Sequence, residues 1–71
     1  MIVQNFDSSL IKSIAYESRV LTVLFTNGKM YAYDKVPKRV FEDFCSAQSK
    51  GKYFNENIRG EYDSEEITGV A

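Results

Sequence analysis

A tight-turn signal, Asn27-Gly28, separates two runs of alternating residues and constrains the fold of this chain more than any other feature. Asn-Gly is the preferred central pair of a two-residue type I′ hairpin, in which both residues have positive φ. The flanking runs, LTVLF and KMYAY, have the composition and alternation of strands. The sequence therefore predicts a β-hairpin that turns at residues 27 and 28.

A two-residue turn also predicts which side chains share a face of this hairpin. With Thr26 opposite Lys29, the more apolar face is assigned to the core, and it carries Leu21, Val23, Phe25, Met30 and Ala32. The opposite face is predicted to be an outer wall, and it carries Thr22, Leu24, Lys29, Tyr31 and Tyr33. A slip of one residue would exchange the two faces. On this interpretation, the two tyrosines form a surface that a ligand or a partner can reach.

The remaining segments predict two more kinds of element. A first strand is expected from about Ser9 to Tyr16, with a bulge near its start, and a polar break at residues 17–19 leads into the second strand. If that break also turns with two central residues, Ile14 meets Val23 and Tyr16 meets Leu21 on the core face. Pro37 is expected to open a helix that reaches about Gln48 and lays Val40, Phe41 and Phe44 over the sheet.

After this helix, Gly51 is expected to interrupt the helical pattern, and Phe54 and Ile58 lie one helical turn apart in a second, shorter helix. The fold class predicted is α+β, a three-stranded antiparallel meander sheet with one main helix on one face and a second short C-terminal helix. Residues 1–71 are expected to form a single domain with a core at 8–62 and an acidic tail at 63–71.

Composition limits the classes of function. Of the 71 residues, 44% are hydrophobic and 27% are charged, which suits one small globular domain. No apolar run reaches membrane-spanning length and the opening MIVQNFDSSL lacks the pattern of a signal peptide, so a cytoplasmic protein is expected. The single cysteine, Cys45, agrees with a reducing compartment and is expected to be a buried thiol.

Catalysis and metal binding are not expected. The chain has no histidine, no recognisable nucleophile motif and no carboxylate pair at a constrained spacing, so the usual acid, base and nucleophile sets cannot be assembled. The acidic residues near the C-terminus are interpreted as solvated charge rather than as metal ligands. We therefore expect no catalytic residue, no metal and no cofactor.

The middle of the chain is basic although the net charge is −1. Residues 29–59 hold seven basic and four acidic side chains, whereas residues 60–71 hold four acidic side chains and no basic one. The stretch SKGKYFN offers backbone amides and lysines to a phosphate, or is simply a joint between helices with solvated lysines. Lys35, Lys38 and Arg39 around Pro37 leave the same two alternatives open. Any polyanion binding is expected to be local.

Several short motifs in the order found here resemble one known family. The segments SSLIKSIAY, LTVLF, NGKMYAYDKVP and AQSKGKYFNENIRGEY, between Ser8 and Tyr62, are similar to the KTSC domain. That domain is named for an appendage at the C-terminus of some lysyl-tRNA synthetases and is also a stand-alone small protein in bacteria and their phages. The resemblance covers about 55 of the 71 positions, and the synthetase context implies RNA binding by analogy. The acidic tail after Tyr62 has no counterpart in it.

The leading hypothesis is a non-catalytic binding module for a nucleotide-type ligand, either an RNA segment or a small nucleotide, including a cyclic one. In a phage-encoded copy, this function would suit sequestration of a host signalling nucleotide. Stacking on tyrosines and neutralisation of phosphate by cations would hold the ligand. The residues assigned to this site are Tyr31, Tyr33, Lys50, Lys52, Tyr53, Asn55 and Arg59. The alternative is a protein-interaction or self-association module, such as a homo-oligomer, that uses the Tyr31 and Tyr33 face.

Overall fold

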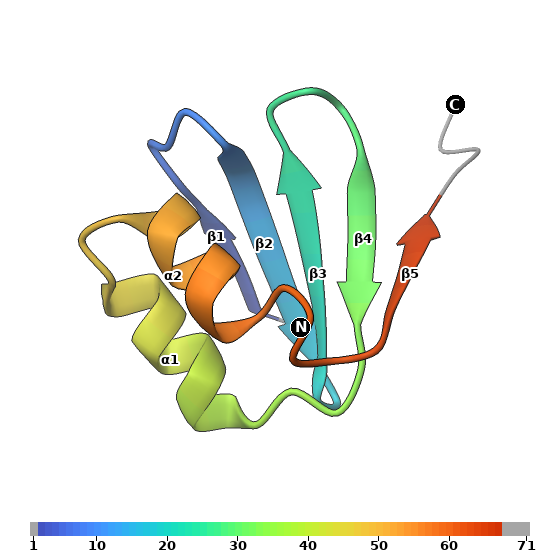
Figure 1. Ribbon diagram of the computed structural model, residues 1–71. Coiled ribbons are helices and arrows are strands. Elements are labelled where there is room, and N and C mark those ends of the chain that lie inside the picture. Colours follow the sequence, from blue (N-terminus) through green and yellow to red (C-terminus); the bar gives the residue numbers. More distant parts are fainter. Residues whose placement is uncertain (1, 68–71) are drawn as a thin grey trace.

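A five-stranded antiparallel sheet with two helices on one face makes up the protein (Figure 1). The computed structural model describes residues 2–67. In chain order the elements are β1 (Ile2–Asn5), β2 (Ile11–Glu17), β3 (Val20–Phe25), β4 (Met30–Tyr33), α1 (Lys38–Ser46), α2 (Lys50–Asn57) and β5 (Ser64–Ile67). The strands lie side by side in sequence order, which makes the sheet a meander.

The predicted α+β class and the two helices are confirmed, but the prediction of three strands is wrong. The strands β1 and β5 extend the predicted meander at its two edges. Nearly all of their residues are exposed, so neither strand shows the alternation of buried and polar residues that marks an inner strand. Ser64–Ile67 forms β5 rather than a tail, while residues 68–71 of the expected tail lie outside the described residues.

The loop between β3 and β4 holds three residues rather than two. The Gly28 amide donates to the Phe25 carbonyl at 3.0 Å, and the Phe25 amide donates to the Lys29 carbonyl at 2.9 Å. Gly28 has a φ of +89°, and Asn27 Oδ1 accepts a hydrogen bond from the Lys29 amide at 2.9 Å. These bonds describe a turn over residues 25–28 closed by a glycine bulge, the common alternative to a two-residue hairpin.

The extra loop residue shifts the register of β4 by one position, so the predicted outer wall is wrong. Tyr31 lies opposite Val23, and Tyr33 lies opposite Leu21. Both tyrosines therefore share the face that carries the core, and Tyr33 is only 5% exposed. Met30 and Ala32, assigned to the core from the sequence, point to the face that the helices leave uncovered, because successive strand residues alternate between faces.

The register between β2 and β3 is as predicted. Ile14 lies opposite Val23 and Tyr16 opposite Leu21, and the register shifts between Ile11 and Ser13, where a bulge was expected. Ser18 and Arg19 have φ angles of 51° and 67°. The two-residue turn with paired positive φ is therefore found here, between Glu17 and Val20, and not at Asn27-Gly28.

The two helices cover the core face with aromatic side chains. Phe41 and Phe44 of α1 are buried, as expected, and so is Phe54 of α2. The rings of Tyr16 and Phe41 stack with centroids 4.8 Å apart, and Tyr16 Oη donates to the Val36 carbonyl at 2.6 Å. Neither helix is long and apolar enough to cross a lipid bilayer.

The boundary between the helices is set by Ser49 and not by Gly51. Ser49 is the N-cap of α2, and its hydroxyl accepts a hydrogen bond from the Lys52 amide at 3.3 Å. Gly51 lies inside the first turn of α2, where an added Cβ would come within 3.3 Å of Leu10 Cδ2. The glycine thus allows α2 to pass close to the start of β2. Pro37 is the N-cap of α1, one residue before the first helical position.

The register of β4 can be tested with two substitutions that the alternative pairing would reverse. Tyr33→Ala is expected to lower the free energy of unfolding by about 3–5 kcal/mol, the usual loss for a large buried aromatic residue. The same loss is expected for Phe44→Ala in the same core. Ala32→Lys is expected to change it by less than about 0.5 kcal/mol, because the new side chain faces outward beside Glu65. Urea unfolding measures both values, and a folded Tyr33→Ala protein alongside an unfolded Ala32→Lys protein would contradict this register.

Candidate functional site

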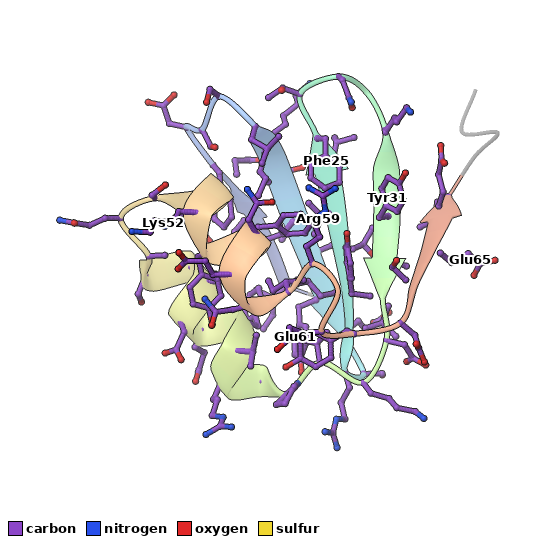
Figure 2. The ribbon with its side chains drawn as sticks, viewed as in Figure 1. Phe25, Tyr31, Lys52, Arg59, Glu61 and Glu65 are labelled. Atoms are coloured by element: carbon purple, nitrogen blue, oxygen red, sulfur yellow. The ribbon has the colours of Figure 1, made fainter. Side chains whose placement is uncertain are left out.

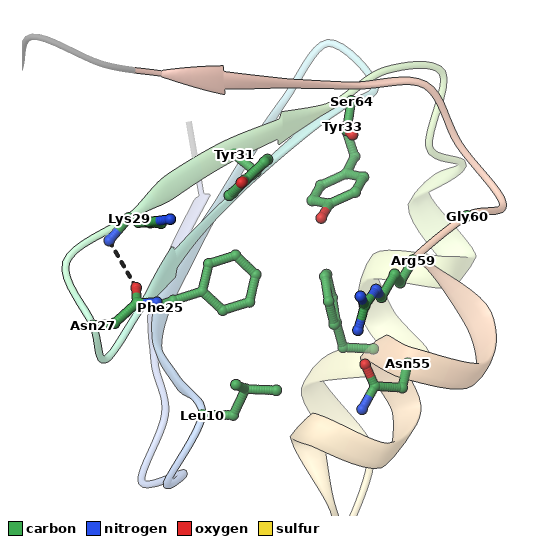
Figure 3. A pocket seen from close by; sticks show the side chains of 11 residues that line it. Leu10, Phe25, Asn27, Lys29, Tyr31, Tyr33, Asn55, Arg59, Gly60 and Ser64 are labelled. Atoms are coloured by element: carbon green, nitrogen blue, oxygen red, sulfur yellow. Dashed lines mark hydrogen bonds between the residues drawn. The ribbon is translucent and has the colours of Figure 1, made fainter.

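A groove of about 470 Å³ lies between the sheet and α2 (Figure 3). One wall comes from β3, β4 and the loop that joins them, and the other comes from α2 and the residues that follow it. The groove is lined by Leu10, Phe25, Asn27, Lys29, Tyr31, Tyr33, Phe54, Asn55, Arg59, Gly60 and Ser64.

Four aromatic rings form the inner part of this groove. Phe25 contacts Tyr31 and Phe54 edge to face, with centroids 5.8 and 5.3 Å apart. Tyr33 contacts Phe54 in the same way at 5.5 Å, and the Tyr31 and Tyr33 rings are tilted at 6.5 Å. Edge-to-face contacts fix the orientation of each ring. The inner part of the groove is therefore an apolar surface of rings that are held in place by one another.

Polar and cationic side chains surround these rings. Arg59 and Asn55 point toward the groove from α2 and its C-terminal end, while Asn27 and Lys29 stand on the β3–β4 loop (Figure 3). Within residues 2–67, neither the Arg59 guanidinium nor the Asn55 amide is engaged in a hydrogen bond or ion pair with another side chain or the backbone. These donors are thus available to a ligand.

The two groove tyrosines differ in how their hydroxyls are used. Tyr31 is half-buried, and its Oη lies 3.4 Å from Glu66 Oε1 on β5. The Tyr33 hydroxyl has no hydrogen-bond partner among the described residues. Burial raises the pKa of Tyr33, the neighbouring Tyr31 raises it further, and the positive charge of Arg59 lowers it. Tyr33 is therefore a neutral hydrogen-bond donor at physiological pH.

Three residues assigned to the ligand from the sequence lie outside this groove. Lys50 Nζ donates to the carbonyls of Cys45 and Ala47 at 2.7 and 2.5 Å and lies 4.9 Å from the centroid of the Phe6 ring. It therefore closes the C-terminal end of α1.

The other two residues outside the groove have separate surroundings. The Lys52 side chain points away into solvent, on the far side of α2 from Arg59 (Figure 2). Tyr53 stacks on Phe44 with centroids 5.4 Å apart, and its Oη lies 3.4 Å from the Val40 carbonyl. Of the seven assigned residues, the structure brings together Tyr31, Tyr33, Asn55 and Arg59.

The sequence interpretation missed the groove residues that lie on β3 and in its loop. Phe25 was assigned to the core only, and Asn27 was treated purely as a turn residue. Both line the groove because the three-residue loop brings Tyr31 and Tyr33 onto the face of Phe25. The sequence held no signal for this loop, because Asn-Gly fits both a two-residue and a three-residue turn.

The groove contains no chemistry that points to a metal or a nucleophile. Residues 2–67 hold no group of three or more histidine, cysteine, aspartate or glutamate side chains that could bind a metal ion. Cys45 is half-buried and does not line the groove. Burial raises the pKa of its thiol, Lys50 lowers it and Glu42 raises it, so the thiolate is disfavoured.

Comparison with known proteins identifies the family. The profile of the KTSC domain matches residues 7–62 of this chain. The chain belongs to the KTSC domain family. A KTSC domain protein from Yersinia pestis, known from its crystal structure, has the same fold, with a TM-score of 0.87 and 37% sequence identity. The match covers 94% of this chain and 97% of that one. The resemblance noted in the sequence is confirmed.

Relatives of this KTSC domain include both large and small proteins. A lysine–tRNA ligase of Nostoc punctiforme is 41% identical over 64 residues, which cover 87% of this chain and 11% of the ligase. A protein of Tsukamurella paurometabola is 37% identical over 54 residues, covering 73% of this chain and 81% of that protein. The chain thus spans about a tenth of the ligases that it matches and most of the smaller relatives.

Ionisation of Tyr33 gives a prediction for stability at alkaline pH. Because its pKa is raised in the folded protein, the folded state holds this proton more tightly than the unfolded chain. Stability is expected to be constant below the ordinary tyrosine pKa of about 10 and to fall as the pH rises above it. Urea unfolding between pH 8 and 11 measures this loss.

Tyr33→Phe is expected to lose less stability over this interval than the wild type, since it has no phenol to ionise at this position. Tyr53→Phe is expected to do the same, because burial also raises the pKa of Tyr53. Identical pH dependence in the wild type and in both variants would contradict the assignment of these two buried phenols.

Proposed function

We propose that this KTSC domain is a non-catalytic binding module that holds a nucleotide-type ligand in the aromatic groove. The observation that carries the proposal is the combination of a four-ring wall with the unpaired Arg59 guanidinium in one preformed groove. Stacking of a base on an aromatic side chain contributes about 1–3 kcal/mol. A guanidinium matches the geometry of phosphate oxygens. Both parts of a nucleotide therefore have a counterpart in the groove.

The size of the groove favours a short ligand. Its volume of about 470 Å³ lies in the lower part of the range for small-molecule pockets, roughly 300–1,000 Å³. The net charge of −1 also argues against a protein that follows a long phosphate backbone, whose binding draws on many cations. The ligand we propose is thus a small nucleotide or one or two unpaired residues of an RNA strand.

The relatives support RNA as one source of this ligand. The matched lysine–tRNA ligases act, by their name, on a tRNA, and a domain fused to such an enzyme would encounter unpaired tRNA residues. We place the contact with RNA in the groove because Tyr31, Phe25 and Arg59 meet there. RNA that binds through exposed aromatic residues is commonly single-stranded.

The alternative is a protein-interaction or self-association module that uses the face of Tyr31 and Tyr33, and both hypotheses assumed that this face is an open outer wall. In the structure Tyr33 is buried against Phe54 of α2, whereas Tyr31 is half-buried and lines the groove. The face that the helices leave uncovered carries Leu24, Met30 and Ala32, of which none is more than half exposed. Light scattering, run beside the binding experiments, measures the molar mass in solution and so reports whether copies of the protein associate through this face.

Binding in the groove is tested by a pair of variants that remove one positive charge each. Arg59→Gln is expected to weaken binding of a fluorescent single-stranded RNA pentamer, or of a nucleoside monophosphate, by tenfold or more, which corresponds to about 1.4 kcal/mol. Lys52→Gln is the matched control, since Lys52 is exposed and lies outside the groove. It is expected to change binding less than twofold. Fluorescence anisotropy and calorimetry at low salt measure the affinities.

Two results would overturn the proposed function. If neither RNA nor nucleotides bind the wild-type protein at low salt, the groove is not a nucleotide site. If Arg59→Gln and Lys52→Gln weaken binding equally, the interaction is general electrostatic attraction rather than recognition by the groove.

A further inference from the structure

The Tyr33 hydroxyl has no hydrogen-bond partner in the described part of the protein, although most of its side chain is buried. Tyr33 is 95% buried, as follows from its exposed fraction of 5%, yet its Oη makes no hydrogen bond within residues 2–67. The fold pairs the hydroxyl of the other buried tyrosine, Tyr16, which donates to the Val36 carbonyl at 2.6 Å. The free hydroxyl of Tyr33 is thus an exception within this core.

This hydroxyl faces the groove and is not sealed in the protein interior. No fully buried side-chain nitrogen or oxygen of the described residues lacks a hydrogen bond, so the unpaired Tyr33 Oη must reach the space of the groove. Figure 3 shows it directed into the groove, between Phe25 on one side and the helix side that carries Arg59 on the other. A ligand in the groove can therefore accept the hydrogen bond that the protein does not supply.

Arg59 is held next to this hydroxyl. Its backbone amide donates to the Phe54 carbonyl at 2.8 Å, which fixes its position directly after the end of α2. Its guanidinium lines the same groove, and its positive charge lowers the pKa of the Tyr33 phenol, whereas burial, the larger effect, raises it. Two donors, one of them cationic, thus face one end of the groove without a protein acceptor between them.

A phenol hydroxyl and a guanidinium together select an acceptor that carries negative charge. The guanidinium offers a planar fork of donors and the phenol adds one more, a set that suits the oxygens of a phosphate. The acidic residue nearest to the tyrosines, Glu66, accepts from Tyr31. The rest of the lining carries the apolar side chains of Leu10 and Phe25, with Asn27 and Lys29 beside them on the β3–β4 loop (Figure 3). Arg59 and Tyr33 therefore face an apolar surface that is bordered by polar residues.

We infer that Tyr33 Oη and the Arg59 guanidinium form an anion seat that takes the phosphate of a single nucleotide, whose base lies against Phe25 and Leu10. This inference rests on the proposed function and assigns the orientation of the ligand within it. Lys50 does not bind the phosphate, because its ammonium is bonded to the carbonyls at the end of α1. Recognition thus depends on the phosphate as well as on the base.

The inference is tested by comparing nucleosides with their 5′-monophosphates on three proteins. The wild type is expected to bind each monophosphate at least tenfold more tightly than the matching nucleoside, and inorganic phosphate is expected to compete. Tyr33→Phe keeps the ring and the packing, and is expected to reduce this ratio at least threefold. Tyr16→Phe, which also removes one buried hydroxyl, is the matched control and is expected to keep the ratio while lowering the melting temperature.

The outcomes separate the inference from the proposed function. Nucleosides that bind as tightly as monophosphates, or an unchanged ratio in Tyr33→Phe, would refute the anion seat and leave nucleotide binding in place. Absence of binding by nucleosides, monophosphates and RNA would refute both. RNA trinucleotides with and without a 5′-phosphate then distinguish the two sources of phosphate. If only the phosphorylated trinucleotide binds as tightly as the monophosphate, the site takes a terminal phosphate. If both trinucleotides bind as tightly as the monophosphate, the site takes a phosphate within the strand.

Discussion

The three-residue loop between β3 and β4 is the constraint on which the rest of the structure depends. Gly28 adopts the positive φ that closes this loop, and the resulting register points Tyr31 and Tyr33 toward the helices. With one residue fewer, the same strand would turn these rings outward and bury Met30 and Ala32 instead. The aromatic core, the groove and the position of α2 all follow from the choice between these two registers.

The groove is built from the same aromatic network that stabilises the fold. Phe54 contacts Phe25, Tyr33 and Phe44, so it joins the groove wall to the centre of the core. The proposed site is thus held in place by core packing, and a preorganised site loses less entropy when it binds. It also means that large substitutions in the wall change stability and affinity together. Variants that keep the ring, such as Tyr33→Phe, are therefore the informative ones.

Local patterns in the sequence predicted the parts of the fold that are fixed by strong periodicity. The helix that carries Phe41 and Phe44, and the pairing of Ile14 with Val23, follow from apolar spacing and from a short polar break. The register of β4 did not follow, because Asn-Gly fits both a two-residue and a three-residue loop. The edge strands β1 and β5 were missed since their residues are exposed and lack alternation. Arg59 and Asn55 were found as candidates, whereas Phe25 and Asn27 depended on the missed register.

The order of the strands has a consequence for how the domain fluctuates. Backbone amides in the central strand β3 are held from both sides by β2 and β4, whereas β1 and β5 are each held from one side. Amide hydrogen exchange is therefore expected to be slowest in the central strand of the sheet and fastest in its two edge strands. The strand that carries Tyr31 and Tyr33 lies one position from a margin, bordered by β5. Transient detachment of β5 would release the Glu66 bond to Tyr31, which frees a hydroxyl at the groove while the inner strands stay paired.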